Sequence, residues 1–376
     1  MSDIHVSGGA VSPRRLPSFA RLIAQRRFQK WAARFPLTRR SVRREGEALF
    51  DLLAGFCHSQ VLMALVQLDI PARLLARPMA VEGLSRLTGV PDQRLRVLLQ
   101  AAEALKLVKL KRDGRYALTR RGAALVGAPG LQQMILHHQV LYRDLADPAA
   151  FFRGENVPGL AHFWPYVFGA DVSADVAQTY SELMAQSQLL VSDDTLDTVP
   201  LAGVRHLLDV GGGTGTFLQE AGERYPAMRL TLFDLPAVAS QAEARFSRSG
   251  LSTRSEIVTG SFRTDPLPVG ADAISLIRVL YDHSDETVER LLAKCHAALP
   301  NGGRLIISEP MSGGAKPERA GDAYFALYTL AMQTGKTRSA EQIAALCRAA
   351  GFESVQAPAP RRAFVTRCVV ATKGTT

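Results

Sequence analysis

The stretch Leu207-Leu-Asp-Val-Gly-Gly-Gly-Thr-Gly215 joins a short apolar run to a cluster of glycines. A short apolar run that ends in a turn is typical of a strand buried on both faces, and the residues after it have helical spacing. Glycines at the carboxyl end of a strand let the backbone approach a ligand and begin a helix whose amides face that ligand. The stretch therefore predicts a ligand-binding turn between a first strand and its helix.

The alternation of strand and helix continues toward the C-terminus. Apolar runs predict further strands at 228–235, 255–262, 271–280 and 303–311, with helices at 236–246 and 284–299. This order predicts an α/β fold with a doubly wound, Rossmann-like and mostly parallel sheet. Two strand-like runs after residue 350 are too close for a helical crossover, so we expect them to pair antiparallel.

Three details of this sheet point to the cofactor. Gly211, Gly213 and Gly215 follow a GxGxG spacing rather than the GxGxxG of dinucleotide-binding turns. Asp209 would repel a pyrophosphate but could face a cationic amino group, and Asp234 ends the second strand where it could accept hydrogen bonds from a ribose diol. Together they favour S-adenosylmethionine over NAD. The alternatives are that Asp209 bonds to the glycine loop and that Asp234 caps the helix that begins at Pro236.

The N-terminal half is expected to be mainly helical. A short helix, a turn, an amphipathic helix from Asp92 to Leu107 and a hairpin with its tip at 111–115 form a winged-helix pattern. The mixed charges of that amphipathic helix favour packing or dimerisation over DNA binding. The predicted domains are a basic segment (1–45), a winged-helix domain (46–128), a helical, substrate-covering region (129–195) and a catalytic domain (196–376).

The positive charge is confined to one end of the chain. Residues 1–44 hold eleven bases and one acid, which accounts for the net +10, and the remaining 34 bases and 34 acids cancel. Apolar residues between the arginines of this segment favour an interfacial helix on an anionic membrane, and a helix packed on this protein or on a second subunit is the alternative. The balanced body argues against nucleic acid as a partner.

The remaining composition predicts the compartment. Four scattered cysteines with no CxxC pair argue against disulfides and structural zinc and fit a reducing compartment. We expect no membrane-spanning stretch, no signal peptide and no metal, and so a cytoplasmic protein.

The motifs "LLDVGGGTG", "LTLFDLP", "LYDHSDE", "ALPNGGRLIISEPM" and "GKTRS" resemble the class I methyltransferase fold, in the O-methyltransferase family with an N-terminal winged-helix dimerisation domain. "HHQVLYRDLADPAAFFRGE" and "EPMSGGAKPERAGDAYFALYTLAMQTGKTRS" are similar to the hydroxycarotenoid methyltransferases of phototrophic bacteria. The resemblance implies a homodimer that uses S-adenosylmethionine to methylate a tertiary hydroxyl of an acyclic 1-hydroxycarotenoid in carotenoid biosynthesis. A second large apolar substrate, such as a bacteriochlorophyll precursor or a polycyclic phenol, and a DNA-binding regulator are the alternatives.

The resemblance also assigns cofactor contacts. It places the cofactor on the glycine turn with Asp209, the ribose at Asp234 and Leu235, and the adenine beside Ser261 and Phe262, although the family usually has Asp at position 261. Arg278 matches a basic residue near the cofactor carboxylate. Met184 and Gln188 fall on the helix that covers the site.

The expected catalytic centre departs from the family. The histidine that acts as the catalytic base in the family matches Tyr281 in this sequence, and Asp282 and His283 follow it. One of its two supporting glutamates matches Glu309, and the other maps near Thr337 and is absent. Tyr281 could orient the substrate hydroxyl while His283, His137 or His138 takes the proton. The non-catalytic alternatives are that Asp282 is a buried or capping carboxylate at the strand end and that His283 is an exposed loop residue. The residues expected on the substrate side are His137, Tyr142, Trp164 and Tyr328.

Overall fold

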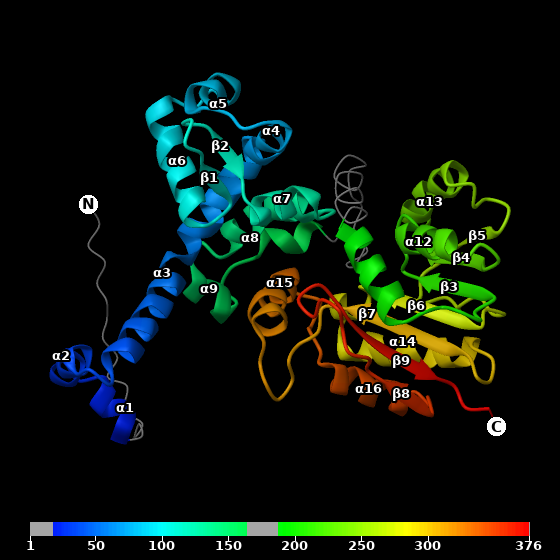
Figure 1. The fold of residues 1–376 in the computed structure, drawn as a ribbon. Helices are drawn as coiled ribbons and strands as arrows, with labels where there is room; N and C mark the ends of the chain where they lie inside the picture. Colours follow the sequence, from blue (N-terminus) through cyan, green and yellow to red (C-terminus); the bar gives the residue numbers. More distant parts are fainter. Residues whose placement is uncertain (1–17, 164–186, 376) are drawn as a thin grey trace. The chain divides into compact units, whose positions relative to one another are not determined.

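The computed structural model describes residues 18–163 and 187–375. Its internal contacts divide the chain into two units, residues 1–64 and 65–376, and each is described by itself. The described part of the first unit contains α1 (Ser18–Ile23), α2 (Arg26–Arg34) and most of α3 (Arg39–Gln67) (Figure 1). The rings of Phe28, Trp31 and Phe35 follow one another along α2 because residues three and four apart share a helix face.

The helix α3 corrects one expectation from the sequence. It contains an 18-residue window with a mean hydropathy of 1.6, so it is long and apolar enough to cross a membrane by length and composition. A core helix of a soluble protein passes the same test, so this finding alone does not indicate a span. Only 17% of that window is buried within the chain, and Leu49, Phe50, Leu52, Leu53 and Phe56 are exposed. These side chains form an exposed apolar surface on α3.

The second unit begins with the winged-helix arrangement. It contains α4 (Ile70–Ala76), α5 (Val81–Thr88), α6 (Asp92–Ala104), the antiparallel pair β1 (Val108–Leu110) and β2 (Tyr116–Leu118), and α7 (Arg120–Gly127). The hairpin turns at Gly114, whose φ of 79° lies in the left-handed region that favours glycine. Leu84, Leu95 and Leu99 close a small core between α5 and α6. The predicted hairpin and helices are therefore present.

A helical segment follows the wing. It comprises α8 (Leu131–Asp144), α9 (Pro148–Arg153), the 3-10 helix η1 (Gly159–Phe163) and, after the gap, a helix over residues 187–198. The buried carboxylate of Asp144 accepts hydrogen bonds from the amides of Gly159 and Leu160, which fixes η1 against α8. The salt bridge from Arg362 to the buried Asp194 ties the second helix to the end of the chain.

The catalytic sheet has seven strands in the order β5-β4-β3-β6-β7-β9-β8. The first five strands of that order are parallel, and β9 runs antiparallel to both of its neighbours, as predicted. The strands are β3 (His206–Val210), β4 (Arg229–Asp234), β5 (Ser255–Thr259), β6 (Ala273–Ile277), β7 (Arg304–Glu309), β8 (Ser354–Gln356) and β9 (Arg367–Thr372).

Helices cover both faces of this sheet (Figure 1). Along β3, Leu207 packs with α12 (Thr216–Arg224) and α13 (Pro236–Arg248), and its neighbour Leu208 packs with α14 (Asp285–Ala298) and α16 (Ala340–Ala349). Consecutive strand residues point to opposite faces, so a continuous apolar run is required when both faces are covered. This burial explains why the first strand reads as Leu-Leu with no polar alternation.

Three elements complete the surroundings of the site. The 3-10 helix η2 (Leu280–Asp282) follows β6, and the π-helix η3 (Arg319–Phe325) leads directly into α15 (Ala326–Met332). The helix α15 contacts both α8 and η2, and so it joins the helical segment to the end of β6. A π-helical turn is uncommon and is often found next to functional sites.

Candidate active site

The glycine-rich turn after β3 has the backbone that only glycine adopts easily. Gly211, Gly213 and Gly215 have φ angles of 71°, 59° and 77°, all in the left-handed region. A Cβ on Gly212 would lie 2.2 Å from the Oδ2 atom of Asp209, so the loop also packs directly on that carboxylate. The chain can therefore pass over Asp209 and lead into α12 only if these positions stay glycine.

Asp209 is completely buried at the end of β3. Its Oδ1 accepts a hydrogen bond from the Ser275 hydroxyl at 2.5 Å, whereas its Oδ2 has no partner among the described residues. Burial raises the pKa of this carboxyl to about 7. No hydrogen bond joins it to a described glycine amide, so the structure does not support the alternative that it bonds to the loop.

Asp234 closes the other side of the turn. Its Oδ2 accepts from the amide of Gly213 and its Oδ1 from the amide of Leu235, each at 2.7 Å. The N-cap of α13 is Leu235, so the alternative reading of Asp234 as a helix cap is wrong. Burial raises the pKa of Asp234, and the two amides oppose that rise. Each carboxylate oxygen keeps a second lone pair that can accept from a diol.

The turn after β5 brings Ser261, Phe262 and His283 together. The amide of Ser261 donates to Asp265 Oδ2 at 2.7 Å, so the carboxylate four residues on stabilises this turn. The ring of His283 meets the ring of Phe262 edge to face, with centroids 5.2 Å apart. Its Nδ1 lies 3.3 Å from Nη2 of Arg263, which can only donate, so Nδ1 is the acceptor in this contact.

His283 is buried, so the alternative reading of it as an exposed loop residue is wrong. Burial, reinforced by the positive charges of Arg263 and Arg338, lowers the pKa of its imidazole to about 4. The ring is therefore neutral at physiological pH and a weak base. Its contact with Phe262 places it on the side of the site where the adenine was expected.

Arg278, Tyr281 and Asp282 follow β6; Tyr281 and Asp282 are buried, and Arg278 is half-buried. Arg278 has a φ of 60°, a strained conformation for a residue with a side chain, and its Nη1 donates to Ser187 Oγ at 2.8 Å. Burial and the charge of Asp282 raise the pKa of Tyr281, and Arg278 opposes that rise. Burial keeps the pKa of Tyr281 well above its usual value, so the phenol remains protonated. It can orient an oxygen but cannot act as a base.

Asp282 is the carboxylate among these three residues. Its side chain is buried, and its Oδ1 has no hydrogen-bond partner among the described residues. Burial raises the pKa of Asp282 well above its usual value, the charge of Arg278 opposes that rise, and the charge of Glu309 adds to it. A carboxylate with a raised pKa and an unused lone pair is a competent proton acceptor.

Glu309 is the last residue of β7 and lies next to Tyr281. Its Oε2 accepts from the backbone amide of Tyr281 at 3.1 Å, and its Oε1 has no partner in the described part of the chain. Burial raises the pKa of Glu309 to about 7, against the charge of Arg338. Glu309 thus holds the main chain of Tyr281, whereas the resemblance implied a carboxylate that supports a histidine side chain.

Two histidine–tyrosine pairs join α8 to η3 and α15. Nε2 of His137 lies 3.0 Å from the Tyr328 hydroxyl, and Nε2 of His138 lies 2.5 Å from the Tyr324 hydroxyl. Burial lowers the pKa of His137 to about 4 and also lowers that of His138. The helix α15, which carries Tyr328, contacts η2, so this pair adjoins the residues after β6.

The remaining predicted residues are less informative. Tyr142 packs edge to face with His138, and Gln188 is half-buried on the helix over residues 187–198. Trp164 and Met184 lie outside the described residues. Sequence reasoning missed Ser187, Ser275 and Arg338, because a serine or arginine carries no spacing signal. Hydrophobic periodicity along the sequence also could not show that Tyr324 pairs with His138.

The donor set fits S-adenosylmethionine. The orphaned Oδ2 of Asp209 suits a cationic amino group, the carboxylate of Asp234 suits a ribose diol, and the ring of Phe262 suits an adenine face. Among the described residues no group of histidines, cysteines and carboxylates could hold a metal ion.

Comparisons with known proteins identify the family. Residues 142–353 match the O-methyltransferase domain, and residues 50–128 match the O-methyltransferase dimerisation domain. The chain is 53% identical to a demethylspheroidene O-methyltransferase of Cereibacter sphaeroides, over 94% of each chain. It is 52% identical to the enzyme of the same name from Rhodobacter capsulatus, over 97% of this chain and 91% of the relative.

The fold agrees with solved structures. Human N-acetylserotonin methyltransferase, solved in complex with SAM, matches with a TM-score of 0.73 and 24% identity over 88% of this chain and 98% of that one. The predicted winged-helix and Rossmann-like architecture is confirmed, and S-adenosylmethionine is confirmed as the cofactor at the level of the family. The dimerisation domain supports a homodimer. The chain belongs to the O-methyltransferase family that carries an N-terminal dimerisation domain.

Proposed function

We propose that this enzyme transfers the methyl group of S-adenosylmethionine to the tertiary hydroxyl of an acyclic 1-hydroxycarotenoid. The observation that carries the proposal is the 53% and 52% identity to two demethylspheroidene O-methyltransferases over almost the whole chain. The buried apolar cluster around Tyr328, which includes Val140, Leu141 and Met332, suits a substrate whose only polar group is one hydroxyl.

The chemistry needs orientation and a proton acceptor. S-adenosylmethionine supplies an electrophilic methyl group on a sulfonium. As the hydroxyl oxygen gains that methyl and the carbon–sulfur bond breaks, the oxygen becomes strongly acidic and must lose its proton. A strong base is therefore unnecessary, and an acceptor in the right place is sufficient.

We assign these roles to adjacent residues. The Tyr281 hydroxyl orients the substrate oxygen, and the carboxylate of the adjacent Asp282, whose buried Oδ1 has no hydrogen-bond partner among the described residues, takes the proton. The charge of Arg278 favours the ionised form of Asp282 before the reaction. His283 serves the cofactor side through Phe262. His137 and Tyr328 bound the space for the hydroxyl end of the substrate.

Turnover tests this function directly. The enzyme is incubated with S-adenosylmethionine and a detergent-dispersed acyclic 1-hydroxycarotenoid, and the methyl ether is quantified by mass spectrometry. We expect efficient formation of the ether and none from the same carotenoid without its hydroxyl. Methylation of a polycyclic phenol or a bacteriochlorophyll precursor in its place would contradict the proposal, and binding of duplex DNA at physiological salt would revive the regulator.

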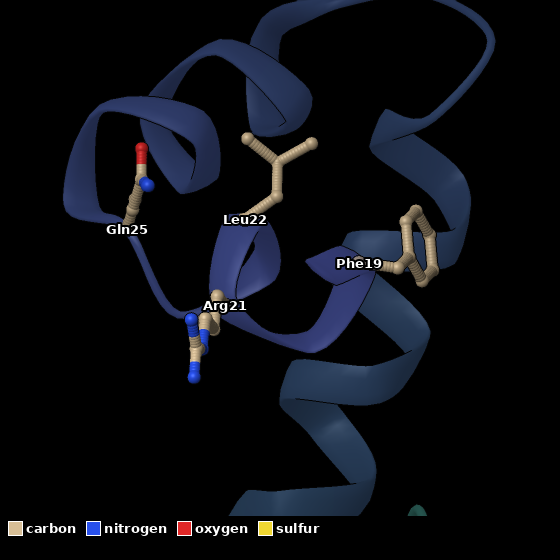
Figure 2. Close-up of a pocket in the computed structure, with 4 residues that line it drawn as sticks. All are labelled: Phe19, Arg21, Leu22 and Gln25. Carbon is tan, nitrogen blue, oxygen red and sulfur yellow. The ribbon is translucent and has the colours of Figure 1, made fainter. Parts of the chain in front are cut away.

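We also propose peripheral contact with an anionic membrane through the N-terminal segment. The described residues 18–44 hold nine bases and no acid. Only Arg43 and Arg44 have a carboxylate within ion-pair distance among the described residues. Apolar side chains stand among the remaining charges: Phe19, Leu22, Ile23, Trp31, Phe35 and Leu37 are all exposed. Phe19, Leu22 and Arg21 line an open hollow with Gln25 beside α1 (Figure 2).

Charge favours a lipid surface over a second copy of the chain as the partner of α1 and α2. An isologous contact would bring two identical sets of nine bases together, and these would repel each other. An anionic lipid surface would attract the same bases. Both family models also leave residues 1–49 unmatched, so the shared dimerisation region does not include α1 and α2. Exposed aliphatic side chains favour a bilayer over a nucleic acid. A cytoplasmic protein that takes a polyene from a membrane needs such a contact.

Vesicle co-sedimentation tests this contact. We expect the full chain to pellet with phosphatidylglycerol vesicles and to remain in solution with neutral phosphatidylcholine vesicles. The double variant Phe19→Ala, Trp31→Ala should lose most of this binding, while Phe364→Ala, a matched exposed aromatic in the other unit, should keep it. Equal sedimentation of the chain with and without residues 1–44 would exclude the segment as the membrane contact.

A further inference from the structure

The loop that carries Tyr281 and Asp282 is held almost entirely by its backbone. The amide of Tyr281 donates to Glu309 Oε2 at 3.1 Å. On the other side, the carbonyl of Tyr281 accepts from the amide of Lys336 at 2.8 Å. The side chains of Tyr281 and Asp282 are thereby left for other contacts.

Arg338 completes this set of contacts. Its Nη1 donates to the carbonyl of Leu280 and its Nη2 to the carbonyl of His283, each at 2.9 Å. Its Nε and Nη2 also contact Asp285 Oδ1, at the first turn of α14. The residue is 1% exposed, which is rare for arginine and requires that nearly every donor be used.

Gly335 adds a steric constraint. A Cβ at this position would lie 2.2 Å from the carbonyl oxygen of Tyr281 and 3.1 Å from the Cα of Asp282. The backbone of Gly335 does not adopt a left-handed φ, so the need for glycine arises from this close approach alone. The segment 335–338 is therefore pressed against the loop on one side, and Glu309 bonds to it on the other.

We propose that Arg338 and Glu309 form a backbone clamp: by bonding to the main chain of residues 280–283, they position Tyr281 and Asp282 for methyl transfer. The clamp takes the place of the second supporting carboxylate, which is absent at Thr337. The inference rests on the proposed function for the identity of the reaction. Arg338 contacts neither substrate nor reacting atoms, so it is a positioning residue. Arginine can do this because one planar guanidinium reaches two carbonyls and a carboxylate at once, which an ammonium cannot.

Two variants disturb the clamp in different ways. Arg338→Lys keeps the charge but loses the fork, and Gly335→Ala keeps every polar group but displaces the loop. For both we expect kcat to fall about 100-fold, the order of magnitude for misplacement of a catalytic group by about 1 Å. The Kd for S-adenosylmethionine, measured by calorimetry, should rise by no more than about tenfold, because the glycine turn is untouched and only the His283–Phe262 contact can be disturbed.

A matched glycine controls for the added methyl group. Gly127 lies at the end of α7 with no atom within 4 Å of an added Cβ, so Gly127→Ala should leave kcat and Kd unchanged. Arg338→Ala supplies a rescue experiment, in which added guanidinium should restore part of kcat. An Arg338→Lys variant with wild-type kcat, or a loss of kcat with an equal loss of cofactor affinity, would overturn the clamp.

Hydrogen–deuterium exchange separates this inference from the proposed function, because it needs no substrate. In the wild type, the amides of residues 280–283 should exchange slowly, and both clamp variants should exchange faster there while β3 and β4 stay protected. Turnover of the wild type tests the carotenoid assignment alone. Unchanged exchange at 280–283 in both variants would overturn the clamp even if the wild type methylates the carotenoid.

Discussion

The carboxyl ends of β3 and β4 and the carboxyl end of β6 are built on different principles. At β3 and β4 the site is mostly main chain, with left-handed glycines and two carboxylates that receive amide or hydroxyl hydrogens. At β6 it is the side chains of Arg278, Tyr281 and Asp282, and Ser187, Glu309 and Arg338 from three other segments hold this part of the chain. The first region keeps the family pattern and the second departs from it. A backbone site tolerates little change, whereas a side-chain cluster can exchange one proton acceptor for another.

The largest expected effect comes from the proton acceptor. Asp282→Asn keeps the size of the side chain but removes its basicity, so kcat should fall by about 10²–10⁴-fold. In the wild type, kcat should rise with pH through the pKa of Asp282, because only the ionised carboxylate accepts a proton, and that pKa lies well above its usual value. The pH–rate profile of both proteins checks this. A variant that keeps both its rate and its acidic limb would return the role of base to a histidine.

Tyr281→Phe should have the next largest effect. The loss of one hydrogen bond to the substrate oxygen should lower kcat about tenfold. The Kd for S-adenosylmethionine should not change, because Tyr281 lies in η2 and not in the glycine turn. Steady-state kinetics together with calorimetry make the measurement. If the variant kept full turnover, the orienting role would be excluded.

Asp209→Asn addresses the other region. A cationic amino group binds the ionised form of the Asp209 carboxylate. Without the cofactor, the pKa of this carboxylate is about 7. The affinity of the wild type for S-adenosylmethionine should therefore rise with pH, by up to about tenfold per pH unit below pH 7. The variant should show weaker binding with little pH dependence. Calorimetry between about pH 6 and pH 8 gives both slopes. Parallel slopes would mean that Asp209 does not sense the cofactor.

The same substitution should change stability in the opposite direction. The pKa of Asp209 is higher in the folded state than in the unfolded state, so the folded state binds the carboxyl proton more tightly. Folding stability is therefore lost as the pH rises from about 4 to about 7. Asp209→Asn removes that loss. The cofactor-free variant should therefore unfold at a higher temperature than the cofactor-free wild type at pH 8, and the difference should shrink near pH 4.

His283→Ala should have the smallest effect on the rate. Its pKa of about 4 leaves it neutral throughout the physiological range, so the pH–rate profile should keep its shape. The loss of its edge-to-face contact with Phe262 should weaken cofactor binding by about threefold to tenfold. Kinetics at saturating cofactor separate the two effects. Disappearance of the acidic limb would identify His283, in place of Asp282, as the group that titrates.

The sequence alone determined the parts of this protein that depend on local chemistry. Apolar runs and glycine spacing predicted the sheet, its mostly parallel strands and the cofactor turn. A strand buried on both faces needs apolar residues on both, and a left-handed turn needs glycine. The motifs also located Tyr281, Asp282 and His283 after β6 and showed that the usual histidine was missing. The identity of the family followed from the same residues.

Only the tertiary structure decided what each of those residues can do. His283 was the natural choice as base from its ordinary pKa, yet burial beside Arg263 and Phe262 makes it a weak base on the cofactor side. Asp282 and Arg338 gain their roles from neighbours that lie up to 58 residues away in the chain. Proton affinity and position depend on desolvation and on such distant partners, and neither is encoded in the spacing of nearby residues.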